Sequence, residues 1–286
     1  MRLNNFLITL IIFFSLSVGK KTTSDFTLTG KNILLSINQK DLGEYKDDYL
    51  KLTDNAASTN DIGFPELPTY STLYLVDSDK DYEFEIIVNE SYTLENVSIY
   101  PYQGDTDNSE NFIVDEDFYN GNQNYPFSNI SVSERMHARN MELVSLTITP
   151  YSYNPNTKNL EVYTNVQISV NEINSDVERS ENTIKRSRLF EQLYADMIIN
   201  FETSSRQEDY QHPAILYICG GDSCENSYVQ QLFEWRHQQG YIVYTATESE
   251  VGGNNASTSE IKNYIEDAVE NWDNPPEMVG LIGDTE

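Results

Sequence analysis

The spacing of hydrophobic positions changes near residue 185, and the change divides the chain into two predicted parts. Upstream, short strand-like runs are separated by polar turns, with little helical periodicity. Downstream, continuous apolar runs alternate with stretches whose apolar residues recur at three and four positions, which indicates strands and helices in turn. The clearest upstream runs are Asn32–Ile37, Ser71–Val76, Phe84–Val88, Val97–Tyr100, Val144–Ile148 and Val166–Val170.

The upstream pattern predicts an antiparallel β-sandwich over residues 20–185. Leu143–Val170 reads as a hairpin or meander, with turn chemistry at Asn154–Thr157. The prolines of Gly63–Pro68 favour an extended segment that leads into the next strand. The 20 tyrosines also favour β structure in this part.

The downstream pattern predicts strand, helix, strand, helix, strand. The strands are Ala214–Cys219, Tyr241–Ala246 and Met278–Ile282. Ser227 and Gln230 have the spacing of a capping box for the first helix, and Ser257 and Glu260 have it for the second. The second helix has one apolar stripe, made of Ile261, Tyr264, Ile265, Ala268, Val269 and Trp272.

Two right-handed crossovers from this order give a parallel sheet whose strands all end on one edge. Sites in open α/β sheets are usually built there. With no helix after the third strand, residues 212–286 read as an incomplete domain. The edge would carry Gly220, Gly221, Asp222, Glu248, Glu250, Gly283 and Asp284.

Residues 186–211 read as an interdomain linker. A short amphipathic helix is predicted from Leu189, Leu193, Ile198 and Phe201, and we expect the first three of these residues to need a packing surface. Basic residues in exposed linkers are candidate processing sites, although they could merely keep the linker soluble. The candidates are Arg186, Arg188 and Arg206. We favour Arg206, because the polar residues around it have nothing to bury.

The formal net charge of −28 argues against nucleic acid or an anionic membrane as a partner, since both require clustered cations. Residues 1–19 read as a secretory signal peptide with Gly19 at the cleavage position. The apolar run is too short to favour an uncleaved membrane anchor. We therefore expect a secreted or cell-surface protein whose mature chain begins at Lys20 and keeps no anchor.

Few residues could carry chemistry. Asp105, Asp107 and Glu116 match part of a calcium-loop spacing, but Glu110 stands where the loop needs glycine, so a solvated acidic loop is favoured. No cofactor and no three-ligand metal cluster is expected. Cys219 and Cys224 could form a local disulfide or remain two thiols. Neither cysteine forms a local signature with a histidine, and the histidines are His137, His212 and His237.

Four downstream segments resemble the start of the gingipain-type cysteine peptidase domain, and three upstream segments resemble its proregion. The first set is Ile215–Asp222, Leu232–Tyr241, Ser259–Ile265 and Pro275–Asp284. The second set is Gly63–Pro68, Thr149–Pro155 and Leu160–Tyr163. The resemblance implies a caspase-like α/β peptidase domain of two similar halves, whose catalytic His and Cys lie in the second half, beyond this chain. It also implies a β-sandwich proregion that acts as chaperone and inhibitor and is then cut away.

We therefore interpret the chain as the N-terminal part of a secreted cysteine endopeptidase precursor. Its parts are a signal peptide (1–19), proregion (20–185), linker (186–211) and the opening of the peptidase domain (212–286). The expected partners are protein or peptide substrates for the whole enzyme, and the proregion itself as an intramolecular contact. By itself this part is expected to be inactive. The alternative is a non-catalytic exported β-sandwich used for adhesion or binding.

Overall fold

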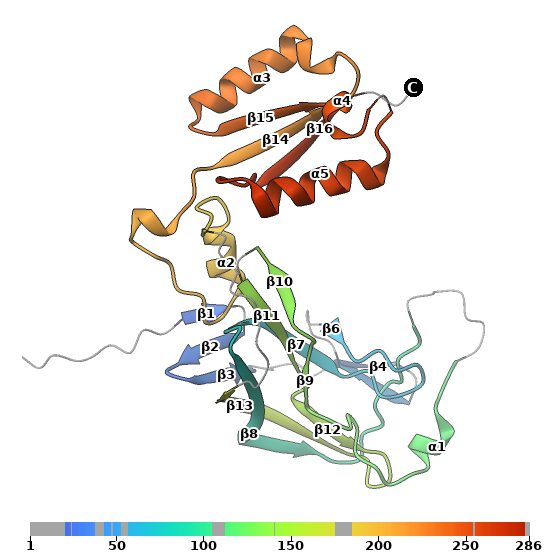
Figure 1. The fold of residues 1–286 in the computed structure, drawn as a ribbon. Coiled ribbons are helices and arrows are strands. Elements are labelled where there is room, and N and C mark those ends of the chain that lie inside the picture. The colour runs from blue at the N-terminus through green and yellow to red at the C-terminus, as the bar shows by residue number, and fades with distance from the viewer. Residues whose placement is uncertain are drawn as a thin grey trace, which may run out of the picture. The chain divides into compact units, whose positions relative to one another are not determined.

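The computed structural model describes residues 21–23, 25–37, 43–46, 48–52, 57–104, 112–139, 141–174, 185–253 and 255–283. These residues form two compact units (Figure 1). The first unit takes the described residues up to Met136, within 142–180 and at 197–200. The second takes 137–141, those within 181–196, and those from Phe201 onward.

The first unit is built from antiparallel strands. One sheet has the order β1-β2-β3-β13-β12, with β8 also paired to β13. In chain order these strands are β1 (Lys21–Thr23), β2 (Phe26–Thr29), β3 (Asn32–Ser36), β8 (Lys80–Leu94), β12 (Tyr151–Asn154) and β13 (Asn159–Asn174).

A second sheet has the order β10-β11-β7-β6, with β9 paired to β11. Its strands are β6 (Ala57–Ser58), β7 (Pro68–Val76), β9 (Ile130–Val132), β10 (Met136–Ala138) and β11 (Met141–Ile148). β4 (Gly43–Lys46) pairs with β5 (Tyr49–Leu52). A single helical turn, α1 (Glu116–Tyr119), lies between β8 and β9 in the chain.

Both sheets contribute to one apolar core in the first unit. Ile33 and Ile168 come from the first sheet, while Leu146 and Ile148 come from the second, and all four are fully buried. Because side chains alternate between the faces of a strand, the buried pattern of β7 and β11 places alternate residues of each strand, such as Tyr74 and Leu146, on the face shared with this core.

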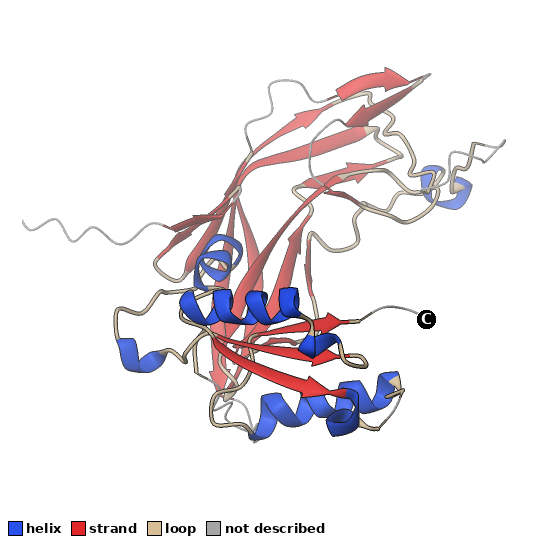
Figure 2. Ribbon diagram, turned by 90° about the horizontal axis from the view of Figure 1, so that it is seen from above, coloured by secondary structure: helices blue, strands red, loops and turns tan. Residues whose placement is uncertain are grey.

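The second unit contains a parallel sheet with the order β15-β14-β16. Figures 1 and 2 show α3 (Ser227–Gln238) on one face of this sheet and α5 (Thr258–Asn271) on the other. Its elements are β14 (Ala214–Cys219), α3 (Ser227–Gln238), β15 (Ile242–Thr247), α4 (Glu248–Val251), α5 (Thr258–Asn271) and β16 (Met278–Ile282). This order confirms the predicted parallel sheet.

The central strand β14 is buried along its whole length because both its faces are covered. Tyr217 packs on Phe233 of α3, with ring centroids 4.9 Å apart. On the other face, Leu216 and Ile218 pack with Ala268 of α5. The continuous apolar run at 214–219 is therefore explained by the central position of β14 in the sheet, where both faces of the strand are buried.

The structure corrects two local predictions. The side chain of Asn226, not Ser227, caps α3, accepting the Tyr228 amide at 2.9 Å. Val97–Tyr100 forms only an isolated bridge between Leu50 and Ile99, and no strand. The predicted linker helix exists as α2 (Glu191–Met197).

The apolar residues near α2 do not all pack as predicted. Leu193 is 50% exposed, and Leu189 is also exposed. Ile198 and Phe201, which follow the helix, are buried. Leu189 precedes α2 and Leu193 lies within it, so the buried apolar side chains of this segment follow the helix rather than line it.

Candidate functional site

The carboxyl ends of β14 and β16 are joined tightly. The Gly220 amide donates to the Ile282 carbonyl at 2.7 Å, and the Ser223 hydroxyl donates to the same oxygen at 3.1 Å. A Cβ at Gly220 would stand 3.2 Å from a Glu248 carboxylate oxygen. The predicted edge therefore brings Gly220, Glu248 and Gly283 together, while Asp284 lies outside the described residues.

A disulfide closes the loop that follows β14. Cys219 and Cys224 are bonded, with their Cα atoms 5.4 Å apart. This resolves the open question about the two cysteines, and it leaves the chain without a free thiol, because the sequence contains only these two. No nucleophilic cysteine is available at this edge in the disulfide state.

The carboxylates at the edge have structural partners. Glu250 accepts the backbone amide of Thr247 at 2.7 Å in a capping box that starts α4, and this hydrogen bond lowers the pKa of Glu250. Glu248 accepts the Asn255 amide at 3.3 Å. Among the described residues, no group of three His, Cys, Asp or Glu side chains could hold a metal ion.

The three arginines of the linker differ in how firmly they are held. The amide of Arg186 donates to the Asp209 carbonyl at 3.0 Å, and the Gln211 amide donates to the Arg186 carbonyl at 3.0 Å. The Arg186 guanidinium lies over the ring of Phe201, 4.9 Å from its centroid. Arg186 is therefore tied down through both its backbone and its side chain.

Arg188 is also engaged, while Arg206 is largely in solvent. Arg188 lies 4.1 Å from the centroid of the Tyr210 ring and donates to the Gln207 side chain at 2.7 Å. The Arg206 side chain is 69% exposed and pairs with Asp209 at 2.9 Å. Arg206 immediately precedes the short 3₁₀ turn Gln207–Asp209.

Tyr210 is the buried centre of this linker, which the sequence interpretation missed. It is 4% exposed, and its hydroxyl donates to the Ser204 carbonyl at 2.8 Å and contacts the Glu191 carboxylate. Burial raises the pKa of Tyr210. A single tyrosine within a polar run was the available sequence signal.

The other predicted site residues are mostly beyond what the structure describes. Gly19, Asp105 and Asp107 lie outside the described residues. Glu116 starts α1, whose first turn is capped by Asp115 accepting the Phe118 amide at 2.8 Å. Of the histidines, His137 lies in β10, His212 precedes β14, and His237 lies in the last turn of α3.

A buried charge pair in the second unit was also missed. Glu277, just before β16, has a side chain only 1% exposed, and Arg139 lies 4.0 Å from it. Arg139 donates to the side chain of Gln211 at 2.9 Å. These residues are far apart in sequence and no motif contains two of them, so no local pattern could have joined them.

Comparisons with known proteins match both parts of the chain. The family model Propeptide_C25 matches residues 51–208, and the model Peptidase family C25 matches residues 208–286. Gingipain R2 of Porphyromonas gingivalis is 23% identical over 234 residues, covering 78% of this chain and 31% of the relative. Gingipain R1 of the same species is 24% identical over 238 residues, covering 78% of this chain and 23% of the relative.

The chain thus spans about a third or less of the curated relatives it matches. A solved complex of the pro- and mature domains of RgpB from P. gingivalis matches with a TM-score of 0.49 and 20% identity. That match covers 62% of this chain and 94% of the other. No helix among the described residues is long and apolar enough to cross a membrane.

Proposed function

The chain belongs to peptidase family C25, whose propeptide it carries, and from this we propose that it is the front part of the precursor of a secreted cysteine endopeptidase. The single observation that carries the proposal is the family match, which continues from the propeptide into the peptidase domain at residue 208. The proposed reaction of the whole protein is hydrolysis of peptide bonds in protein or peptide substrates by a thiolate that a histidine activates.

The catalytic His and Cys are proposed to lie outside these 286 residues. The disulfide supports this placement, because it occupies both cysteines of the chain. It also supports the proposed export through residues 1–19, since disulfides persist in oxidising compartments. Cleavage of the signal peptide after Gly19 is part of the same proposal. The described residues of the second unit then supply a sheet edge without a reacting Cys-His pair.

Residues 20–185, most of which lie in the first unit, are proposed to be a β-sandwich proregion that contacts and inhibits the peptidase domain, which is itself proposed to be caspase-like. The core shared by two antiparallel sheets supports the sandwich. The proposed boundaries stay at residues 20–185 for the proregion, 186–211 for the linker and 212 onward for the peptidase domain. No bound cofactor is required by this proposal, and structural calcium at Asp105, Asp107 and Glu116 is not part of it.

Processing is proposed to occur after Arg206, in preference to Arg186 or Arg188. A protease must draw its substrate into an extended form, and exposed chain with few contacts does so most readily. Arg186 and Arg188 are held by backbone hydrogen bonds or ring contacts, whereas most of the Arg206 side chain is in solvent.

Limited trypsin digestion of the folded chain, followed by mass spectrometry, tests the processing site. We expect the first cut after Arg206, and Arg206→Ala should slow that cut at least about tenfold while Arg188→Ala leaves its rate unchanged. First cleavage between Lys185 and Arg188, with Arg206 intact, would contradict the proposal.

The activity needs a separate experiment on the whole precursor, of which this chain is a part. After processing, casein hydrolysis should appear, and iodoacetamide should abolish it because the reagent alkylates the proposed thiolate. Processed protein that binds casein without cleaving it would instead support a binding function.

A further inference from the structure

Glu277 carries a carboxylate in an unfavourable position. Its side chain is 1% exposed, and burial raises the pKa of Glu277. Among the described residues, neither carboxylate oxygen accepts a hydrogen bond of normal geometry. An ionised carboxylate without compensation is costly in such surroundings, so the charge of Glu277 requires a nearby cation.

The nearest described cation is the guanidinium of Arg139, which comes from the turn between β10 and β11. Its Nη2 atom lies 4.0 Å from Oε1 of Glu277 and donates to Oε1 of Gln211 at 2.9 Å. Gln211 is fixed in turn, since its Nε2 donates to the Pro275 carbonyl at 2.9 Å. The Ser187 hydroxyl and the Arg139 guanidinium both oppose the rise in the pKa of Glu277.

We call Ser187, Gln211, Pro275 and Glu277 the Glu277 socket. Every member belongs to the second unit, and so does the turn that carries Arg139. Ser187 and Gln211 are themselves buried, at 4% and 6% exposure. The socket is thus a desolvated acceptor site that a guanidinium fills.

The backbone of Arg139 has a conformation that supports a dedicated role. Its φ angle is +56°, in the left-handed region that side chains other than glycine and asparagine rarely adopt. Such a conformation persists where the surroundings over-determine it. The hydrogen bond from the Arg139 guanidinium to Gln211 is one contact of that kind.

We propose that the guanidinium of Arg139 neutralises the buried carboxylate of Glu277. The stability of the α/β unit then depends on a turn that belongs to the upstream propeptide segment. Arg139 lies within the region matched by Propeptide_C25, whereas Glu277 lies within that matched by the peptidase family. The inference extends to maturation and there rests on the proposed processing after Arg206. Removal of the upstream chain would take Arg139 away, and the Glu277 carboxylate would then have to be hydrated or protonated.

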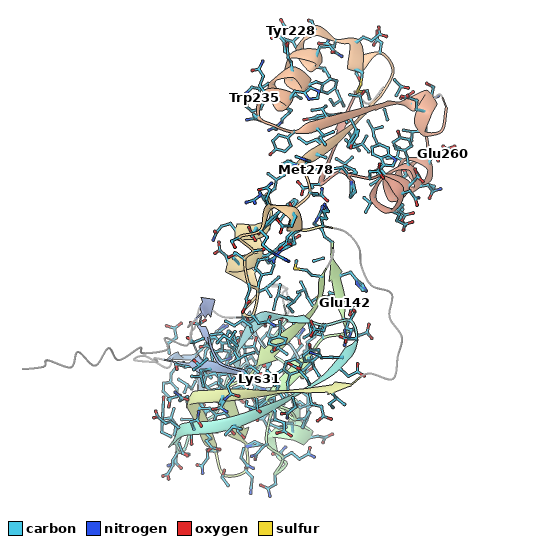
Figure 3. All side chains as sticks on the ribbon, turned by 60° about the vertical axis from the view of Figure 1, so that its left-hand side comes forward. Lys31, Glu142, Tyr228, Trp235, Glu260 and Met278 are labelled. Carbon is cyan, nitrogen blue, oxygen red and sulfur yellow. A yellow bond between two sulfur atoms is a disulfide. The ribbon has the colours of Figure 1, made fainter. Side chains whose placement is uncertain are left out.

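Urea unfolding of the uncut chain, followed by tryptophan fluorescence, tests this dependence. Both tryptophans of the sequence, Trp235 and Trp272, lie in the second unit and report on it alone (Figure 3 labels Trp235 on α3). Arg139→Ala should raise the equilibrium constant for unfolding of this unit at least about tenfold, because it strands a buried carboxylate. Lys262→Met is the matched control, since Lys262 is 73% exposed and pairs only at the surface with Glu266.

The decisive variant is the double substitution Arg139→Ala with Glu277→Gln. With the buried charge removed by Glu277→Gln, adding Arg139→Ala should change the equilibrium constant for unfolding by less than about threefold, as expected for coupled residues. If Arg139→Ala does not fold at all, recovery of folded protein by adding Glu277→Gln supports the same conclusion.

An effect of Arg139→Ala that is equally large with native Glu277 and with the Glu277→Gln substitution would overturn the proposal, as would an effect no larger than that of Lys262→Met. Because these measurements use uncut chain and no peptidase assay, they are independent of the proposed function. A failure of trypsin to cut after Arg206 would refute the maturation step and leave the Arg139–Glu277 coupling standing.

Discussion

At the scale of single residues, the side chains that matter most in the second unit are those whose partners are distant in sequence. Glu277, Gln211 and Arg139 meet through the fold, and no motif contains two of them. The Cys219–Cys224 disulfide is the opposite case, because its partners lie five positions apart. Sequence reasoning could frame that pairing but could not decide it, since strand geometry sets whether the Cα atoms come close enough.

The disulfide should contribute modestly to stability because the loop it closes is short. Replacing both Cys219 and Cys224 by Ala should lower the free energy of unfolding by about 2 kcal/mol, the loop-closure value for so few residues. Urea unfolding with tryptophan detection measures this, and reductant added to the native chain should reproduce the shift. Without reductant or denaturant, we expect no labelling by iodoacetamide, and labelling of both cysteines would show that the bond does not form.

At the scale of elements, the locally encoded features were predictable and the pairing-dependent ones were not. The capping box of Ser257 and Glu260 forms as its spacing predicts, with the Glu260 amide donating to the Ser257 hydroxyl at 3.3 Å. Val97–Tyr100 has strand-like composition but joins no sheet, because β propensity needs a partner strand to be realised. The long pairing of β8 with β13 is equally invisible locally, since its register is set by contacts across the sheet.

Gly280 shows how a pairing constrains a residue inside a strand. It lies opposite Tyr217, and a Cβ at Gly280 would stand 2.6 Å from Cδ1 of the tyrosine ring. Gly280→Ala should therefore lower the free energy of unfolding by about 1–3 kcal/mol, the usual cost of overpacking. Pairing it with Tyr217→Leu should make the alanine better tolerated than it is beside the ring. Equal costs in both backgrounds, by urea unfolding, would show that the ring contact is not the cause.

At the scale of the whole molecule, charge is the dominant global property. A formal net charge of −28 gives a self-repulsion that disfavours the compact state. Ion pairs that could offset it, such as Lys31–Glu172 and Lys262–Glu266, are mostly exposed and contribute little. The charge was readable from composition, whereas the division into units that interleave along the chain required the fold.

Salt should therefore stabilise the protein. Raising NaCl from about 0.02 M to about 0.5 M shortens the Debye length and screens repulsion between carboxylates. We expect the midpoint of thermal unfolding to rise by about 2–4 °C, the shift that about 1 kcal/mol produces in a chain of this size. A fall in the midpoint would mean that the ion pairs outweigh the repulsion.

Calcium chloride and magnesium chloride at equal ionic strength should raise the unfolding midpoint by equal amounts if residues 105–116 form only a solvated acidic loop, because screening depends on charge alone. An additional rise with calcium would instead show a calcium-selective site, for which Asp105, Asp107 and Glu116 are the candidate ligands, since only a binding site distinguishes the two ions.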